Sequence, residues 1–258
     1  YTDAATGCSN TDATTVTVHA LPVPGMNHAP VACANVPFLF TNTTSGASTY
    51  EWDFGDGTSS YSSDPTHIYT ATGTYDVRLI AISGAGCRDT TFSVVDVWDV
   101  PAVSVVLSTD TGCGPLEVEF TNGSSGDGLS FAWEFGGFGG SSDADPVPFI
   151  FPTDPNDAIT YTVSLTASNT CGQALATAPV TVLPPPTALF GPNLNEYCSF
   201  TEVPFGNASY GAPTAFQWFF GDGATSTDPG PTVTHSYVAD DDPLLMAVIL
   251  VASNSCGS

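Results

Sequence analysis

The sequence predicts an all-β fold made of tandem β-sandwich domains. Residues that favour strands (Thr, Val, Tyr and Phe) are abundant, and glycine and proline contribute 25 and 21 of the 258 residues, as is usual for short strands joined by tight turns. Long stretches of the helix formers Ala, Leu, Glu and Lys are absent. One pattern occurs three times at a period of about 80 residues, which suits one independently folding sandwich per copy better than a solenoid unit.

A tryptophan marks the centre of each copy. The motifs are WDFGDGT at 52–58, WEFGGFGG at 133–140 and WFFGDGA at 218–224, and their tryptophans are 81 and 85 residues apart. Side chains alternate between the two faces of a strand, so each tryptophan and the phenylalanine two residues later are expected on the core face. Strands are expected before the motifs at 37–42, 116–122 and 203–207, and after them at 75–81, 161–167 and 246–252.

The Gly-Asp-Gly sequence that follows two of the tryptophans predicts a tight turn with positive φ. We expect Asp56 to accept hydrogen bonds from amides of its own turn. The residues assigned to this structural motif are Trp52, Gly55, Asp56, Gly57, Trp133, Trp218, Gly221, Asp222 and Gly223.

Seven cysteines follow the same period. Cys33, Cys113 and Cys198 open the repeats, and Cys87, Cys171 and Cys256 close them. This spacing predicts one disulfide within each repeat, and buried free thiols are the alternative. Because disulfides persist in oxidising compartments, the pairing indicates an extracellular, cell-surface or secreted protein. The expected bonds are Cys33–Cys87, Cys113–Cys171 and Cys198–Cys256, with Cys8 unpaired in this segment.

Joints rich in proline set the expected domain boundaries. Proline fixes φ, so we expect semi-rigid joints and repeats arranged as a rod. The chain reads as a window of a longer array, with strand exchange between copies as the alternative. The expected segments are 1–20, the C-terminal strand region of a preceding repeat that accounts for the odd Cys8; repeat 1 at 21–99; repeat 2 at 100–183; and repeat 3 at 184–258, without its last strand.

The charge of the chain excludes two classes of partner. There are 26 acidic residues against two arginines, Arg78 and Arg88, and no lysine, so the formal net charge is −24. Almost nothing is available to neutralise phosphates, which excludes ordinary nucleic-acid binding and docking on an anionic membrane. No apolar run approaches the roughly 20 residues that a membrane-spanning helix needs.

The first repeat resembles a polycystic kidney disease (PKD) domain through YEWDFGDGTSS at 50–60 and DPTHIYTATGTYDVRLIA at 64–81. Repeat 3 keeps Trp218, Phe220, His235 and Tyr237 of this pattern, whereas repeat 2 has glycines at the turn and Phe-Ile-Phe at 149–151 in place of His-x-Tyr. The resemblance implies Ig-like sandwiches that act in tandem as extracellular spacers, adhesive modules or mechanically loaded modules. The cysteine-bracketed form is similar to repeats in very large surface proteins of Bacteroidota-type gliding or biofilm-forming bacteria.

No residue pattern indicates catalysis. His67 and His235 occupy the same repeat position, which the resemblance makes structural, and no nucleophile motif or lysine is present. No cofactor is expected, and the calcium candidates are the acidic run Asp240, Asp241 and Asp242 and the turn carboxylates Asp56 and Asp222. Asn-x-Ser/Thr triplets begin at Asn42, Asn122 and Asn207, where a structural turn and a glycan are both open.

These features predict a non-enzymatic structural or adhesive segment of a large extracellular surface or filament protein. The expected partners are neighbouring repeats, other copies in a filament and, as a further option, surface glycans or proteins. The alternative is a carbohydrate- or protein-binding accessory region of a secreted hydrolase. That alternative requires exposed aromatic side chains, for which the candidates are Tyr61, Phe138, Tyr210 and Phe219.

Overall fold

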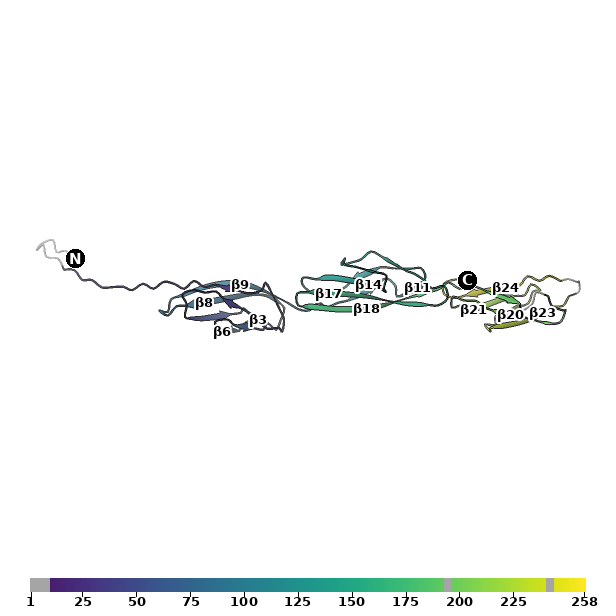
Figure 1. The fold of residues 1–258 in the computed structure, drawn as a ribbon, viewed down its shortest axis with the longest axis horizontal. Coiled ribbons are helices and arrows are strands. Elements are labelled where there is room, and N and C mark those ends of the chain that lie inside the picture. Colours follow the sequence, from purple (N-terminus) through teal and green to yellow (C-terminus); the bar gives the residue numbers. More distant parts are fainter. Residues whose placement is uncertain (1–9, 193–195, 240–243) are drawn as a thin grey trace. The chain divides into compact units, whose positions relative to one another are not determined.

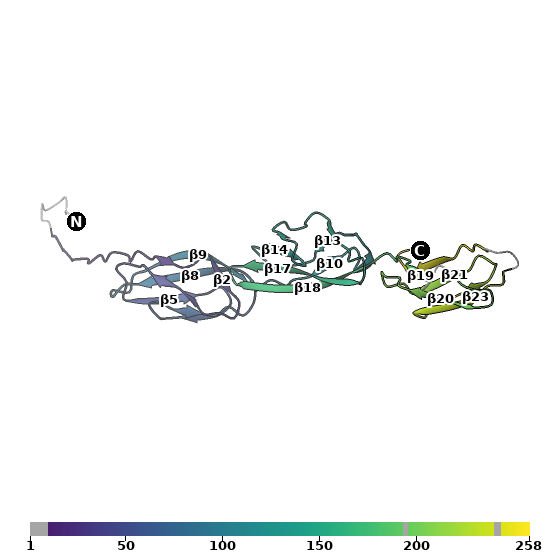
Figure 2. The same ribbon diagram turned by 45° about the vertical axis from the view of Figure 1, so that its right-hand side comes forward.

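The computed structural model describes residues 10–192, 196–239 and 244–258. Every regular element in these ranges is a β-strand, which confirms the predicted all-β class (Figures 1 and 2). Within the same ranges, no helix is long and apolar enough to cross a membrane. The chain divides into two compact units, Tyr1–Val100 and Pro101–Ser258. Cys8 and Asp240, Asp241 and Asp242 lie outside the described residues.

Repeat 1 forms a β-sandwich around a five-stranded sheet. The order of this sheet is β2-β9-β8-β5-β6, and β2 runs parallel to the end of β9 while the other neighbours are antiparallel (Figure 2). Short strand pairs, β3 with β7 and β1 with β4, make up the opposing layer. The strands are β1 Met26–Asn27, β2 Val31–Cys33, β3 Phe38–Leu39, β4 Thr41–Asn42, β5 Thr49–Asp53, β6 Ser59–Ser60, β7 Thr66–His67, β8 Gly73–Ile82 and β9 Arg88–Trp98.

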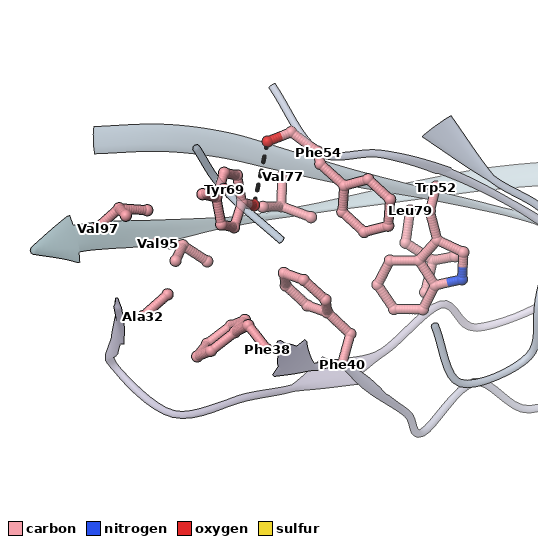
Figure 3. Close-up of a cluster of buried hydrophobic side chains, with 10 residues drawn as sticks. All are labelled: Ala32, Phe38, Phe40, Trp52, Phe54, Tyr69, Val77, Leu79, Val95 and Val97. Atoms are coloured by element: carbon pink, nitrogen blue, oxygen red, sulfur yellow. Dashed lines mark hydrogen bonds between the residues drawn. The ribbon is translucent and has the colours of Figure 1, made fainter. Parts of the chain in front are cut away.

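Alternation along the strands fills the core of repeat 1. Val77 and Leu79 point inward from β8, and Trp52 of β5 lies beside Leu79 in the same layer (Figure 3). Phe38 and Phe40 pack against them from the opposing layer, and the ring centroids of Phe40 and Trp52 are 5.7 Å apart. Burial of each large side chain contributes about 1.5–3 kcal/mol.

Repeat 2 reproduces this topology strand by strand. Its five-stranded sheet has the order β11-β18-β17-β14-β15, with β11 parallel to the end of β18, and β12–β16 and β10–β13 form the opposing pairs. A separate buried cluster surrounds Trp133. The strands are β10 Val105–Leu107, β11 Thr111–Cys113, β12 Leu116–Val118, β13 Phe120–Asn122, β14 Ser130–Phe135, β15 Gly140–Ser141, β16 Phe149–Phe151, β17 Ile159–Asn169 and β18 Gly172–Leu183.

Repeat 3 has two three-stranded sheets, β19-β20-β23 and β22-β21-β24. Trp218 lies in a third buried cluster with Phe205 and Phe220. The strand expected at 246–252 begins later, because regular pairing with β21 starts at Ile249. The strands are β19 Phe190–Pro192, β20 Glu202–Asn207, β21 Ala215–Phe219, β22 Thr225–Ser226, β23 Thr232–Ser236 and β24 Ile249–Ser253.

The first prediction compares two leucines on neighbouring strands of repeat 2. Leu165 of β17 is fully buried, whereas Leu175 of β18 is 64% exposed. We expect Leu165→Ala to lower the free energy of unfolding by roughly 2–5 kcal/mol, because it leaves a cavity beside Trp133. Leu175→Ala is the matched control and should stay within about 0.5 kcal/mol of the parent. Urea unfolding followed by tryptophan fluorescence measures both; equal losses would contradict the assigned core face.

Candidate functional site

The indole N–H of each motif tryptophan bonds to a backbone carbonyl ten residues further along the chain. Trp52 Nε1 donates to Ser62 O at 3.0 Å, and Trp133 Nε1 donates to Asp143 O at 3.1 Å. In repeat 3, Trp218 Nε1 donates to Asp228 O at 3.3 Å. A buried indole N–H without an acceptor would be costly, so this bond both satisfies the core and fixes the loop after the motif.

The two glycines of the turn are needed for different reasons. Gly55 has φ of +79°, and a Cβ built on it would lie 2.7 Å from the carbonyl oxygen of Asp76 on β8. Gly57 also has positive φ, +89°, but a Cβ there would meet nothing within 4 Å. Gly221 and Gly223 repeat this difference in repeat 3, where the close backbone atom is the carbonyl oxygen of Ala247. The first glycine therefore permits close backbone approach, and the second only the turn conformation.

The aspartate between these glycines closes its own turn. Asp56 Oδ1 accepts hydrogen bonds from the Thr58 N–H at 3.0 Å and from its hydroxyl at 2.6 Å. Asp222 Oδ1 accepts the Ala224 N–H at 2.9 Å. These contacts confirm the predicted role of Asp56.

In repeats 1 and 3 a histidine from the opposing layer contacts the turn aspartate. We call this aspartate–histidine contact the clamp. His67 Nε2 lies 2.7 Å from Asp56 Oδ2, and the His67 ring stacks on Phe54 with centroids 4.1 Å apart. Repeat 3 has the same arrangement, with 2.6 Å between His235 and Asp222. The tyrosine two residues after each histidine donates its hydroxyl to the carbonyl of the motif phenylalanine, as Tyr69 does to Phe54 (Figure 3). The histidine thus ties the turn to the opposite sheet.

Repeat 2 replaces this polar clamp with aromatic stacking. Phe149 occupies the histidine position and stacks on Phe135, with centroids 5.2 Å apart. Phe151 replaces the tyrosine and is fully buried, so no hydroxyl has to be satisfied. The backbone bond that closes the turn is kept, because the Gly139 carbonyl accepts the Phe135 N–H at 3.0 Å as the Thr58 carbonyl accepts the Phe54 N–H in repeat 1. The loss of Asp and His together has a physical reason, because either one alone would lack its partner.

The charged state of both turn aspartates is favoured by their hydrogen bonds. Burial opposes the charge on Asp56, but the hydrogen bonds from Thr58 and His67 outweigh it and hold the pKa of the carboxyl below its ordinary value. The hydrogen bond from His235, followed by that from the Ala224 N–H, lowers the pKa of Asp222. Burial raises the pKa of Tyr69, and the neighbouring Asp56 raises it further.

Among the described residues, the turn aspartates are not part of a metal-binding cluster of side chains. Within the part of the chain that the structure describes, no group of three or more His, Cys, Asp or Glu side chains could hold a metal ion. Asp56 and Asp222 face hydrogen-bond donors instead. The calcium candidates Asp240, Asp241 and Asp242 lie outside the described residues, so that hypothesis stays a prediction.

The asparagine of each Asn-x-Ser/Thr triplet forms a turn. Asn42 Oδ1 accepts the Thr44 N–H at 2.9 Å, and Asn122 Oδ1 accepts the Ser124 N–H at 2.9 Å. Asn207 makes the same bond to Ser209 at 3.1 Å. Each side chain therefore has a structural use in its repeat.

Both arginines form ion pairs on the outer face of the repeat 1 sheet. Arg78 lies 3.0 Å from Asp53, and Arg88 bonds Glu51. The exposed Tyr61 lies beside this face and, with Trp52 and Arg78 among others, lines a shallow hollow of about 290 Å³. The other exposed aromatic candidates belong to repeats 2 and 3: Phe138, which packs on Phe149 and Tyr161, and Tyr210 and Phe219.

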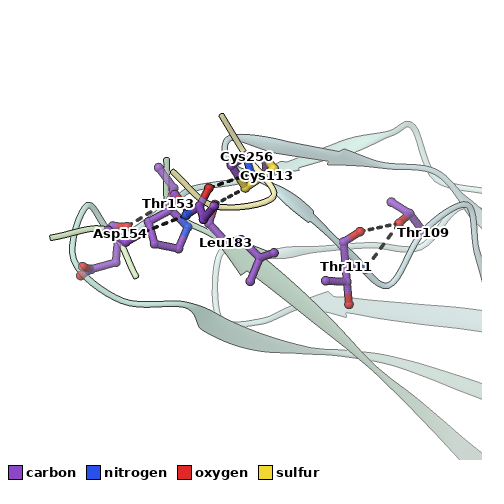
Figure 4. The surroundings of a disulfide bond; sticks show 10 residues. Thr109, Thr111, Cys113, Thr153, Asp154, Leu183 and Cys256 are labelled. Atoms are coloured by element: carbon purple, nitrogen blue, oxygen red, sulfur yellow. Dashed lines mark hydrogen bonds between the residues drawn. A yellow bond between two sulfur atoms is a disulfide. The ribbon is translucent and has the colours of Figure 1, made fainter. Parts of the chain in front are cut away.

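The cysteine pairing within repeats is wrong. Cys113 of repeat 2 is bonded to Cys256 of repeat 3, with Cα atoms 5.4 Å apart and a sequence separation of 143 positions (Figure 4). This bond excludes Cys113–Cys171 and Cys198–Cys256. Cys87 and Cys198 are free thiols, which also excludes Cys33–Cys87. Cys33 and Cys171 are disulfide-bonded.

The topology explains why the predicted pairs cannot form. Cys113 lies opposite Leu183 at the end of β18, whereas Cys171 precedes the start of the same strand. Twelve residues at ~3.3 Å each separate these points by roughly 40 Å, against a Cα–Cα distance of about 4.4–6.8 Å in a disulfide. Cys33 and Cys87 stand at opposite ends of the 11-residue β9 in the same way.

The closing hairpin of repeat 3 instead docks on the joint before it. Asn254 Nδ2 donates to the carbonyls of Pro184 and Gly211, both at 2.9 Å. Asn254 Oδ1 accepts the Cys256 N–H at 2.7 Å, and Cys256 Sγ lies 3.9 Å from Leu183 O. These bonds place the sulfur of Cys256 at the end of β18, where Cys113 is.

Comparison with known proteins agrees with this geometry. Models of the PKD domain match residues 20–97 and 104–182. The chain belongs to the PKD domain family. Its tandem Ig-like fold also matches an I-band fragment of titin, at 14% identity, over 93% of this chain and 96% of that one, with a TM-score of 0.60. A Glu-to-Ala variant of those titin domains is 14% identical and matches with a TM-score of 0.61, over 92% of this chain and 96% of that one. The PKD1 domain of the Vibrio cholerae metalloprotease PrtV is 29% identical over 30% of this chain and 98% of its own, with a TM-score of 0.28.

The second prediction separates the two turn glycines of the first PKD domain. Gly57→Ala should cost about 1 kcal/mol of stability, the usual penalty for a side chain at positive φ. Gly55→Ala should cost roughly 1–3 kcal/mol more, because its Cβ also collides with β8. Urea unfolding midpoints measure both variants, and equal costs would show that close approach to β8 is not a constraint.

The third prediction concerns acid stability. The carboxyl of Asp222 has a pKa below its ordinary value of 3.8 in the folded state, so the unfolded chain takes up the proton first as pH falls. The stabilisation by ionised Asp222 is therefore complete at a pH above the pKa of this carboxyl in the unfolded chain. It is lost as pH falls through the pKa of the same carboxyl in the folded chain. Asp222→Asn should lower stability at pH 7 and flatten its loss below pH ~4.

Thermal unfolding between pH 7 and pH ~2 measures this effect. The exposed Glu202→Gln on β20 of the same repeat is the control for the loss of one negative charge. An acid profile of Asp222→Asn that is parallel to the parent profile would contradict the clamp.

Proposed function

We propose that this chain is a non-enzymatic structural or adhesive segment of a large extracellular surface or filament protein, in which PKD domains follow one another in series. Tandem PKD domains are typically extracellular structural or binding modules, and such domains are generally non-catalytic. The proposal goes one step further, to a load-bearing or adhesive role for this particular array.

The observation that carries the proposal is that histidine and cysteine side chains make structural contacts. His67 and His235 each contact a turn aspartate and stack on an aromatic ring. The bond Cys113–Cys256 connects one repeat to the next. A cross-link between repeats resists their separation, which is of use to a spacer or filament and of no use to an isolated binding domain.

Charge supports an extracellular array of this kind. A net charge of −24 on a surface with few cations keeps neighbouring molecules apart. Salt screens this repulsion within about 8 Å at physiological ionic strength. Contacts between copies are then decided by shape and by covalent links rather than by charge attraction.

Antibodies against the chain test the location in the source organism. Binding to intact, unpermeabilised cells or to material shed from them is expected, with loss of attachment or of surface filaments when the gene is disrupted. Labelling only after permeabilisation, or hydrolytic activity of the purified chain, would contradict the proposal.

The second candidate is a binding region of a secreted hydrolase, and the hollow beside Tyr61 favours it. Carbohydrate sites commonly use an exposed aromatic ring with nearby polar groups, and Glu51, Asp53 and Arg78 supply these. Retention on insoluble polysaccharide that Tyr61→Ala abolishes would support this candidate. Phe219→Ala, an exposed aromatic on another repeat, is the matched control, and no retention of the parent chain would remove the candidate.

A further inference from the structure

The free thiol of Cys87 occupies the position that Cys256 occupies in its disulfide. Cys256 Sγ lies 3.9 Å from the carbonyl oxygen of Leu183, and Cys87 Sγ lies 4.0 Å from that of His19. Leu183 and His19 are equivalent, since each directly follows a Val-Thr-Val sequence, at 180–182 and 16–18. The closing cysteine of repeat 1 thus lies at the end of the segment before it, as the closing cysteine of repeat 3 does.

The bonding partner of Cys256 is an opening cysteine, Cys113. Cys113 lies opposite Leu183 in the parallel β11–β18 pair, and the next residue, Gly114, donates its N–H to Leu183 O at 2.9 Å. The end of the last strand therefore brings two cysteines together. One is the opening cysteine of the same repeat, and the other is on the closing hairpin of the next repeat.

Cys198 already has the geometry of an opening cysteine. Two residues after it, Phe200 has φ of +66° and donates its N–H to Tyr237 O at 2.8 Å. Two residues after Cys33, Asn35 has φ of +62° and donates to Tyr69 O at 2.8 Å. Cys198 is exposed as a free thiol.

We propose that Cys198 and Cys87 are the two halves of a further disulfide of the Cys113–Cys256 type, which closes when another array of these PKD repeats is placed next in series. Cys198 takes the thiol of a closing hairpin, and Cys87 takes the thiol of an opening segment. A second copy of this chain supplies both, since its Cys87 is a closing cysteine and its Cys198 an opening one. The inference rests on the bridge geometry and not on the proposed function, so the two fail separately.

The bond forms by ordinary thiol–disulfide exchange. Each of the two thiols loses a proton, the new S–S bond takes the place of the two S–H bonds, and two electrons pass to the oxidant. Oxidised glutathione is the oxidant in the test, and it is reduced to two molecules of glutathione. An oxidising extracellular compartment supplies an equivalent acceptor.

Two variants of the chain, both also carrying Cys8→Ser so that Cys8 cannot take part, test the proposal. Cys87→Ser keeps Cys198, and Cys198→Ser keeps Cys87. Each is incubated alone and in a 1:1 mixture in glutathione redox buffer at 0.15 M salt, then analysed by non-reducing electrophoresis and by mass spectrometry of linked peptides. The mixture is expected to give a covalent dimer that contains one Cys87–Cys198 linked peptide and that dithiothreitol separates. Each variant alone is expected to stay monomeric.

Three results would overturn the proposal. They are a mixture that stays monomeric, a homodimer formed by either variant alone in the same yield as the mixed dimer, and a peptide map in which Cys113 is bonded to Cys171.

A peptide map of material from the source organism distinguishes the two origins of the partner cysteine. A Cys198 peptide linked to Cys87 indicates a second copy, and one linked to a different cysteine of the closing class indicates a neighbouring repeat of a longer polypeptide; either supports the bridge, and unlinked Cys198 opposes it.

Discussion

The hydrogen bond from a buried indole to a carbonyl ten residues away is the constraint on which each domain depends. It occurs with the same spacing at Trp52, Trp133 and Trp218. The ring fills the space between the sheets, and its N–H fixes the loop that leads to the opposing layer. The turn between the tryptophan and this loop is then held in one backbone conformation. That conformation requires a glycine where the turn lies closest to the backbone of the next strand.

The remaining parts of the motif stabilise this path and can be exchanged as a set. Repeats 1 and 3 hold the turn with an aspartate–histidine contact, and repeat 2 holds it with stacked phenylalanines. The polar set is sensitive to acid because a carboxylate accepts its hydrogen bonds, and the aromatic set is not. Equivalent geometry from different chemistry indicates that the motif serves the fold rather than a reaction.

The sequence was sufficient to predict most of the strands, the inward tryptophans and the role of Asp56, since each follows from alternation or from local turn chemistry. It was not sufficient for the cysteines. Spacing assigned Cys113 and Cys171 to one repeat, but only the parallel pairing of β11 with the end of β18 shows that they lie at opposite ends. Parallel pairing joins segments about 70 residues apart, and no local pattern reports it. The domains therefore depend on their cores for stability, and the cross-link Cys113–Cys256 stabilises a joint.

Hydrogen exchange of Trp133→Ala tests most directly whether each domain has its own core. The substitution should cost roughly 3–5 kcal/mol, because it removes the largest side chain of the repeat 2 cluster. Mass spectrometry of deuterated peptides should then show faster exchange in β14 and β17, with β8 and β9 of repeat 1 unchanged. Equal acceleration in β8 and β9 would contradict the account, because it would require one core shared by the two units.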